Sequence, residues 1–191
     1  ALHAIQAGHA MHKRMVGLQQ EMVAKGFPAI KIGIGINTGL MRVGNMGSSY
    51  RVAYTAMGDA VHLASRLESL TRQYDTWIIS GQETQRRVPG YVWRELDLVR
   101  VKGKQEPVTI FEPCGEEQGL AEEYLGDIIL FNKMVVAYRD QQWEAAEAML
   151  IDLLRSKPDR KLYSLYLERV RQYRAVPPPA GWDGVCTFEH K

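Results

Sequence analysis

The segment from Tyr54 to Glu68 most constrains what this chain can fold into, because it carries a strand directly into a helix. A strand containing Thr55 leads through a turn at Gly58 into a helical stretch. His62 and Arg66 stand four residues apart, so both side chains leave that helix on one face. The free N–H groups and the dipole of a helix N-terminus favour an anion. Strand, turn and helix in this order therefore predict a site for a phosphate-bearing substrate.

Residues before this segment show first a helical and then a strand periodicity. A helix is expected over residues 1–25, and strict alternation predicts a strand over residues 30–36. Gly33, Gly35 and Gly39 resemble a dinucleotide fingerprint, but their spacing is one residue too long, so close backbone packing is the better interpretation. The apolar positions of the helix are Leu2, Ile5, Met11, Met15, Leu18 and Met22.

A hairpin is expected next, followed by the helix that carries His62 and Arg66. Strands starting at Leu40 and over residues 50–57 are joined by a turn at residues 45–49. The helix is expected over residues 59–73, with its buried side formed by Val61, Ala64, Leu67 and Leu70.

The following stretch returns to strands. We expect a short strand over residues 76–79 and a short helix opened by a capping box at residues 80–83. Longer strands follow over residues 91–101 and 108–111, joined by a turn that contains Lys102 and Lys104. Strands and helices interleaved in this way predict a mixed α+β fold.

The composition changes at Pro113, which suggests two structural units. Residues 1–113 form the first unit, residues 114–119 read as a linker, and residues 120–191 form a helical extension. Three helices are expected there, over residues 120–141, 143–155 and 161–174. Tyr138, Trp143, Ala145, Ala146 and Pro158 are placed as in one tetratricopeptide (TPR) unit. One such unit cannot bury both of its faces, so we expect it to pack on the first unit.

Charge and cysteine content limit the possible partners. The net charge is +2, from 24 basic and 22 acidic residues, which argues against nucleic acid or an anionic membrane as the main partner. No apolar run is long enough to cross a bilayer, so no direct membrane contact is expected. Cys114 and Cys186 form no close pair and fit a reducing cytoplasm, where we expect the chain to be located.

Residues 30–112 resemble a class III adenylate/guanylate cyclase catalytic domain of bacterial type. The resemblance rests on Ile32-Gly33-Ile34-Gly35-Ile36-Asn37-Thr38-Gly39, Val43-Gly44-Asn45-Met46-Gly47-Ser48, the segment from Tyr54 to Glu68, and Val101-Lys102-Gly103-Lys104 with Pro107-Val108. It implies a ferredoxin-like sheet and the conversion of a nucleoside triphosphate into a 3′,5′-cyclic nucleotide and pyrophosphate. It also implies two metal ions, Mg²⁺ or Mn²⁺, and a site shared by two subunits placed head to tail. The helical extension resembles that of bacterial cyclases with a sensor.

The same resemblance implies roles for four residues. Thr55 corresponds to the residue that reads the base, and its hydroxyl favours ATP because it can accept a hydrogen bond from the adenine amino group. Ala56 borders the base through its backbone. Arg66 corresponds to the arginine that stabilises charge on the α-phosphate in the transition state. His62 stands where the family usually has asparagine, which predicts lower activity or an altered pH dependence.

The resemblance covers only the second half of the family's domain. The strands that carry the two metal-binding aspartates and the base-reading lysine are expected before residue 1, and Asp59 and Asp75 lie in other contexts. A sheet without those strands has an unpaired edge, which favours domain swapping with a second cyclase subunit. We therefore expect an adenylate cyclase domain in intracellular signalling that is inactive as this chain alone.

Two other interpretations remain open at this point. The chain could be a non-catalytic cyclase relative that binds a nucleotide or a partner as a regulatory module, or an interaction module whose helical extension carries the function. For the single residues, Thr55 could be a strand threonine chosen for its β-propensity. Arg66 could be a helix-surface arginine paired with Asp59 or Glu68.

Overall fold

The computed structural model describes residues 1–48, 50–101 and 106–188 of the chain. Its main sheet has five strands in the order β1-β4-β6-β5-β7, so β1 and β7 lie at the edges. The β1–β4 and β5–β7 pairs are parallel, whereas β4–β6 and β5–β6 are antiparallel. The strands are β1 (Ile34–Ile36), β4 (Ile78–Gly81), β5 (Tyr91–Val101), β6 (Val108–Glu116) and β7 (Cys186–Phe188). This mixed α+β architecture confirms the fold class expected from the sequence.

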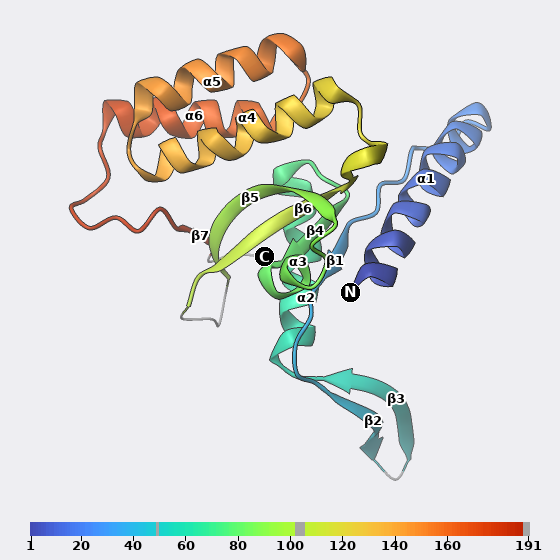
Figure 1. The fold of residues 1–191 in the computed structure, drawn as a ribbon. Coiled ribbons are helices and arrows are strands. Elements are labelled where there is room, and N and C mark those ends of the chain that lie inside the picture. Colours follow the sequence, from blue (N-terminus) through green and yellow to red (C-terminus); the bar gives the residue numbers. More distant parts are fainter. Residues whose placement is uncertain (49, 102–105, 189–191) are drawn as a thin grey trace.

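Helices cover the sheet as separate layers (Figure 1). The extension forms a three-helix layer over β5 and β6, while the N-terminal helix lies at the other end, beside β1. One hydrophobic core runs from the second helix through the sheet into the extension, which confirms that the extension packs on the first unit. The helices are α1 (Leu2–Ala24), α2 (Asp59–Tyr74), α3 (Gln82–Arg86), α4 (Glu122–Arg139), α5 (Trp143–Ser156) and α6 (Lys161–Ala175), with a short 3₁₀ helix at Glu117–Gly119.

Close packing of α2 on β1 depends on the glycines of the strand. A Cβ at Gly35 would overlap the carbonyl oxygen of Ala64, and one at Gly33 would overlap the hydroxyl of Thr71. The helix backbone therefore lies directly on the strand, which confirms the packing role expected for these glycines. Leu67 and Leu70 are buried as predicted, and the rest of the buried side differs: it consists of Leu63, Thr71 and Tyr74 rather than Val61 and Ala64.

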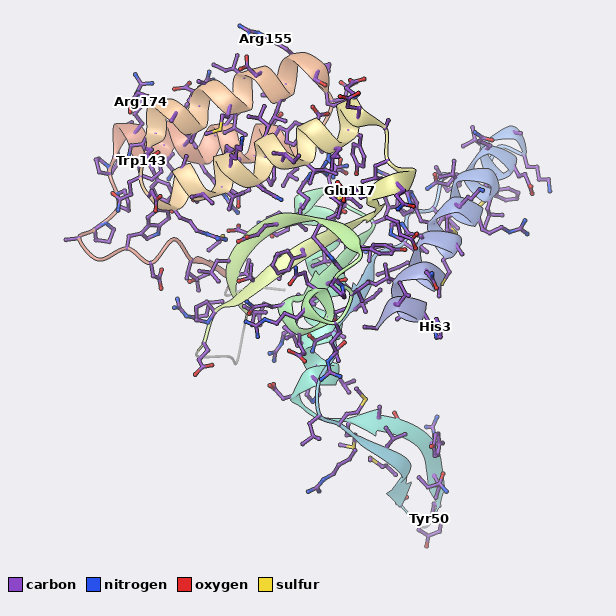
Figure 2. All side chains as sticks on the ribbon, in the orientation of Figure 1. His3, Tyr50, Glu117, Trp143, Arg155 and Arg174 are labelled. Atoms are coloured by element: carbon purple, nitrogen blue, oxygen red, sulfur yellow. The ribbon has the colours of Figure 1, made fainter. Side chains whose placement is uncertain are left out.

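A two-stranded hairpin projects from the body of the molecule just before α2 (Figure 1). It consists of β2 (Arg42–Ser48) and β3 (Arg51–Met57), paired antiparallel from Arg42–Met57 to Ser48–Arg51. Tyr50 lies at its tip and points away from the protein (Figure 2). The hairpin was predicted, but its turn was not: residues 45–48 belong to β2, so the strands continue closer to the tip than the glycine and serine content indicated.

Several other boundaries differ from the sequence prediction. The strand expected over residues 30–36 forms only at Ile34–Ile36, and the one expected over 76–79 lies at Ile78–Gly81. β6 continues through residues expected to form a linker, because Trp93 and Val92 of β5 still pair with Pro113 and Gly115. The expected capping box is absent: α3 has no side-chain cap, and the hydroxyl of Ser80 is buried without a hydrogen-bond partner among the described residues.

The two ends of the chain also depart from the prediction. Only Ile5 and Gly8 are buried in α1, and Met11 and Leu18 are exposed, so the apolar spacing of this helix does not mark a buried face. β7 was not predicted at all. The turn expected around Lys102 and Lys104 lies outside the described residues.

An ion cluster of Glu112, Arg94 and Arg160 connects the extension to the sheet. Glu112 of β6 accepts hydrogen bonds from Arg94 of β5 and, at 2.8 Å, from Arg160 at the start of α6. Thr76 donates a further hydrogen bond to this carboxylate at 2.7 Å. Burial raises the pKa of Glu112, but the charges of Arg94 and Arg160 outweigh it and lower the pKa to about 2. The carboxylate is therefore ionised whenever the protein is folded near neutral pH.

Candidate active site

The N-terminus of α2 is positioned by a glycine and an amide. Gly58 has a φ of 145°, a conformation that side chains rarely adopt, and its carbonyl accepts hydrogen bonds from the backbone N–H groups of Val61 and His62 at 3.1 and 3.2 Å. Asn37, just after β1, donates its side-chain N–H to the carbonyl of Ala60 at 3.0 Å. The first turn of α2 is thus tied to the end of the strand on which the helix lies.

His62 and Arg66 lie on the side of α2 that faces away from β1. Ala64 and Glu68 approach the strand, and residues two positions earlier lie roughly opposite them on a helix. His62 is exposed and Arg66 is half-buried. Among the described residues Arg66 makes no ion pair, so the surface pairing with an acid that would explain it as an ordinary helix arginine is not found there.

Thr55 and Ala56 lie on β3, at the point where the hairpin approaches the helix. Thr55 is opposite Gly44 on β2, and Ala56 is opposite Val43. Gly44 has no side chain and would meet nothing within 4 Å if it had one, so the space beside the exposed Thr55 hydroxyl is open. No hydrogen bond joins Thr55, His62 and Arg66 within the described part of the chain. The four predicted site residues therefore lie on two consecutive elements, β3 and α2, and the side chains of Thr55, His62 and Arg66 are not joined by hydrogen bonds among the described residues.

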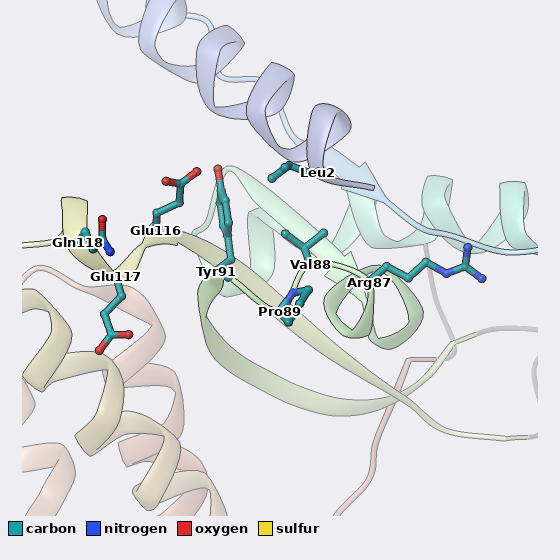
Figure 3. A pocket seen from close by; sticks show the side chains of 9 residues that line it. Leu2, Arg87, Val88, Pro89, Tyr91, Glu116, Glu117 and Gln118 are labelled. Carbon is teal, nitrogen blue, oxygen red and sulfur yellow. The ribbon is translucent and has the colours of Figure 1, made fainter.

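Two cavities lie near opposite ends of the sheet. One, of about 510 Å³, adjoins the first turn of α2 and is lined there by Asp59, Ala60 and Leu63. The other, of about 390 Å³, lies under the N-terminus of α1, between Leu2, Val88 and Tyr91 (Figure 3). None of its lining residues belongs to the segment from Tyr54 to Glu68, so of these two cavities the first adjoins the candidate site.

Metal ligands are not gathered anywhere in the part of the chain that the structure describes. No group of three or more histidine, cysteine, aspartate or glutamate residues there could hold an ion. The described residues thus do not provide the ligands of a divalent metal ion. Those residues also contain no helix with the length and apolarity that a membrane span requires.

The order of these features is that of a known enzyme family. A family model described as the adenylate and guanylate cyclase catalytic domain matches residues 2–112, more than half of the chain. The chain belongs to this family. The match includes α1, the hairpin and the whole of α2, so the glycine-packed helix and its N-terminal tether are parts of a cyclase domain.

Relatives of this cyclase chain include enzymes from bacteria and from an amoeba. It is 33% identical to adenylate cyclase 1 of Rhizobium meliloti over 60% of the chain and 17% of that protein. It is 37% identical to adenylate cyclase of Anabaena cylindrica over 59% of the chain and 23% of that protein. The terminal-differentiation-specific adenylate cyclase of Dictyostelium discoideum is 41% identical over 48% of the chain and 4% of that protein. The chain thus spans less than a quarter of the length of each of these relatives.

Two solved cyclase structures share its fold. The adenylyl cyclase CyaB from P. aeruginosa superposes with a TM-score of 0.54 and 35% identity, over 62% of both chains. The guanylyl cyclase Cya2 superposes with a TM-score of 0.51 and 30% identity, over 61% of this chain and 60% of that one. Because one acts as an adenylyl and the other as a guanylyl cyclase, the likeness identifies the cyclase fold and leaves the choice of nucleotide to the side chains of the site.

One positioning residue was missed by sequence reasoning. Asn37 was grouped with the strand motif, yet its amide holds the turn of α2 that carries His62. The available signal was a polar residue with two hydrogen-bonding atoms placed at the end of an apolar strand, shortly before Gly39.

Proposed function

We propose that this chain supplies the base-reading and transition-state side of an adenylate cyclase site, which converts ATP into 3′,5′-cyclic AMP and pyrophosphate. The observation that carries the proposal is the state of Arg66, a half-buried arginine on α2 with no ion pair among the described residues. An arginine held in this way is available to an anion, and its fixed fork of donors suits phosphate oxygens.

The reaction assigns a task to each side chain. The ribose 3′-oxygen attacks the α-phosphorus, and the bond from that phosphorus to pyrophosphate breaks. Negative charge increases on the oxygens of the α-phosphate in the transition state. Arg66 stabilises that charge, and His62 orients the ribose by donating a hydrogen bond. Divalent metal, when bound, supplies activation of the attacking oxygen, and we assign its ligands to residues other than those the structure describes.

Recognition of adenine is assigned to Thr55. Its hydroxyl can accept a hydrogen bond from the adenine amino group, and the absence of a side chain on the facing Gly44 leaves room for a base. The backbone of Ala56, the next residue on β3, borders the same space. ATP is therefore the proposed substrate in preference to GTP.

The hairpin supports a two-subunit site. Leu40 and Tyr50 are 96% and 98% exposed, and Val52 on β3 is 62% exposed. A two-stranded ribbon standing alone in water is marginally stable, so this apolar surface is suited to a second cyclase subunit, placed head to tail. That subunit would bring the metal-binding side of the site opposite Arg66.

A second candidate function is favoured by His62. The family has asparagine at this position, and an imidazole is bulkier than the asparagine amide and can carry a positive charge. Both properties are unfavourable for a group that holds the ribose. Under this alternative the chain is a non-catalytic relative that binds nucleotide or a partner cyclase and regulates it.

We expect cyclic AMP to form from ATP when this chain is combined with a cyclase subunit that carries the two metal-binding aspartates, in the presence of Mg²⁺ or Mn²⁺. The 191-residue chain alone should form none, because its described residues offer no metal site. Product would be measured by chromatography, with GTP as the competing substrate. Product from the chain alone would refute the two-sided site, and nucleotide binding without product from the combination would favour the regulatory alternative.

Replacing His62 by asparagine should raise the turnover number for cyclic AMP formation, because it restores the smaller amide donor of the family. The turnover of both enzymes is measured with ATP under the same conditions. A fall in turnover would mean instead that the histidine has been recruited into the reaction of this enzyme.

A further inference from the structure

Three elements of the fold meet at the carboxylate of Asp97, and a fourth is linked to it through Arg169. This residue of β5 is 1% exposed. The oxygen Oδ2 of Asp97 accepts a hydrogen bond of 2.7 Å from the hydroxyl of Tyr74, the last residue of α2. The same oxygen accepts a hydrogen bond of 2.6 Å from Arg169 of α6. A second nitrogen of Arg169 lies 3.3 Å from the sulfur of Cys186 on β7. The carboxylate thus joins the helix of the candidate site to the helical extension.

The contacts of Asp97 with Tyr74 and Arg169 are buried and charged, so a change in their geometry would cost free energy. Burial, together with the charge of Asp97, raises the pKa of Tyr74 well above its usual range, so the hydroxyl stays protonated and continues to donate. The guanidinium of Arg169 lies 6.0 Å from the centre of the Tyr74 ring and 5.2 Å from that of Tyr166. If α6 moved away, Asp97 would be left as a buried charge without its cation.

α2 is held at both ends by polar contacts. Asn37 fixes its first turn, and Asp97 fixes its last residue through Tyr74. Arg66 lies between these contacts, about 12 Å along the helix axis from Tyr74 at the usual rise per residue. Because α2 is one continuous helix packed directly on β1, we expect a displacement at Tyr74 to be transmitted along it to Arg66.

We propose that Asp97 is a positioning residue through which α6 of the extension sets the placement of Arg66 in the site. The extension then acts as a control element of the cyclase: whatever displaces α6 changes turnover through Tyr74. This inference rests on the proposed function of Arg66, while the mechanical link between α6 and α2 stands on the contacts alone.

The link is tested by hydrogen exchange of the α2 amides in the 191-residue chain. Arg169→Lys keeps the charge but loses the fork that holds Asp97 and Cys186. We expect the amides of Leu70 to Tyr74 to exchange about 10-fold faster, the change that follows from losing one charged hydrogen bond. Tyr74→Phe, which keeps the buried ring and loses only the hydroxyl, should have the same effect and serves if the lysine variant fails to fold.

Tyr166→Phe is the matched control. Tyr166 is also buried on α6 and donates a hydrogen bond of 2.7 Å to β5, but its acceptor is the carbonyl of Leu96. This variant should leave exchange in α2 within about twofold of the wild type, a change too small to represent a lost hydrogen bond. Equal acceleration of α2 by Arg169→Lys and Tyr166→Phe, or no acceleration by either Asp97-contact variant, would overturn the link.

The effect on catalysis is measured in the two-subunit enzyme. Arg169→Lys and Tyr74→Phe should lower kcat about 5-fold with KM for ATP unchanged, because a displaced Arg66 fails mainly in the transition state. Tyr166→Phe should retain the kcat of the wild type. If Arg169→Lys and Tyr74→Phe accelerated hydrogen exchange in α2 but left kcat unchanged, the positioning role of Asp97 would be overturned. A wild-type enzyme without cyclase activity would refute the proposed function alone, since the exchange result is obtained without turnover.

Discussion

We expect replacement of Arg66 by alanine to lower the turnover number for cyclic AMP formation by about 10²-fold or more, the loss typical of removing one preorganised donor from a transition state. The effect should fall on kcat, with KM for ATP changed little. Arg66 is half-buried on α2 without an ion pair among the described residues, and the proposed function makes the substrate its main partner. Because no acid is left unpaired there when it is removed, the fold should tolerate the change.

Two further variants separate charge, geometry and helix effects. Arg66→Lys keeps the charge and loses the planar fork, so it should recover only part of the lost rate. Arg72→Ala removes an exposed arginine from the last turn of the same helix and should leave turnover unchanged. An Arg66→Ala enzyme with the turnover of the wild type would exclude Arg66 from the site, and equal losses in Arg66→Ala and Arg72→Ala would indicate a general effect on the helix.

The fold was predictable where local periodicity and tertiary packing agree. α2 and the three helices of the extension bury apolar residues at helical spacing, so their positions follow from the sequence. The hairpin turn was misplaced because asparagine, glycine and serine at residues 45–48 mark a turn by composition. In the structure these residues pair with β3 across an exposed ribbon, where small side chains are tolerated.

Long-range pairings were the part that the sequence could not reveal. β7 has three residues and exists because the chain returns to the edge of β5, where Val99 pairs with Cys186. The extension of β6 past Pro113 likewise depends on pairing with β5. Such short segments have no periodicity of their own, and their conformation is set by a strand that is distant in sequence.

The residues of the candidate site also differ in whether local sequence or long-range contacts determine their positions. Thr55, His62 and Arg66 lie within one continuous segment, so a motif places them, although their roles remain proposals. Asn37 and Asp97 act on α2 from β1 and β5, and only the folded arrangement brings them to the helix. Positioning contacts between elements were therefore the information that the sequence lacked.

Replacing Glu112 by glutamine should lower the free energy of unfolding at pH 7 by about 3–5 kcal/mol, the usual cost of breaking a buried ion pair. Glutamine has nearly the same shape but no charge, so the Arg94 guanidinium, which is 1% exposed, is left without a carboxylate. The loss should be visible in urea denaturation followed by circular dichroism. Since the cluster joins the extension to the sheet, both parts should unfold in one transition that occurs at lower urea concentration.

The pH dependence of unfolding in acid measures the contribution of the Glu112 carboxylate to stability independently. Its pKa is about 2 in the folded protein against a usual value of 4.5, so its contribution is complete above pH 4.5 and is lost as the pH falls to about 2. That shift corresponds to about 3 kcal/mol in the wild type, and the Glu112→Gln variant should lack this part of the pH dependence. Glu123→Gln, which breaks the exposed pair with Lys157, is the control and should retain it. If the Glu112 and Glu123 variants lost stability equally at pH 7 and kept the same acid profile, the ion cluster would not be what holds the extension on the sheet.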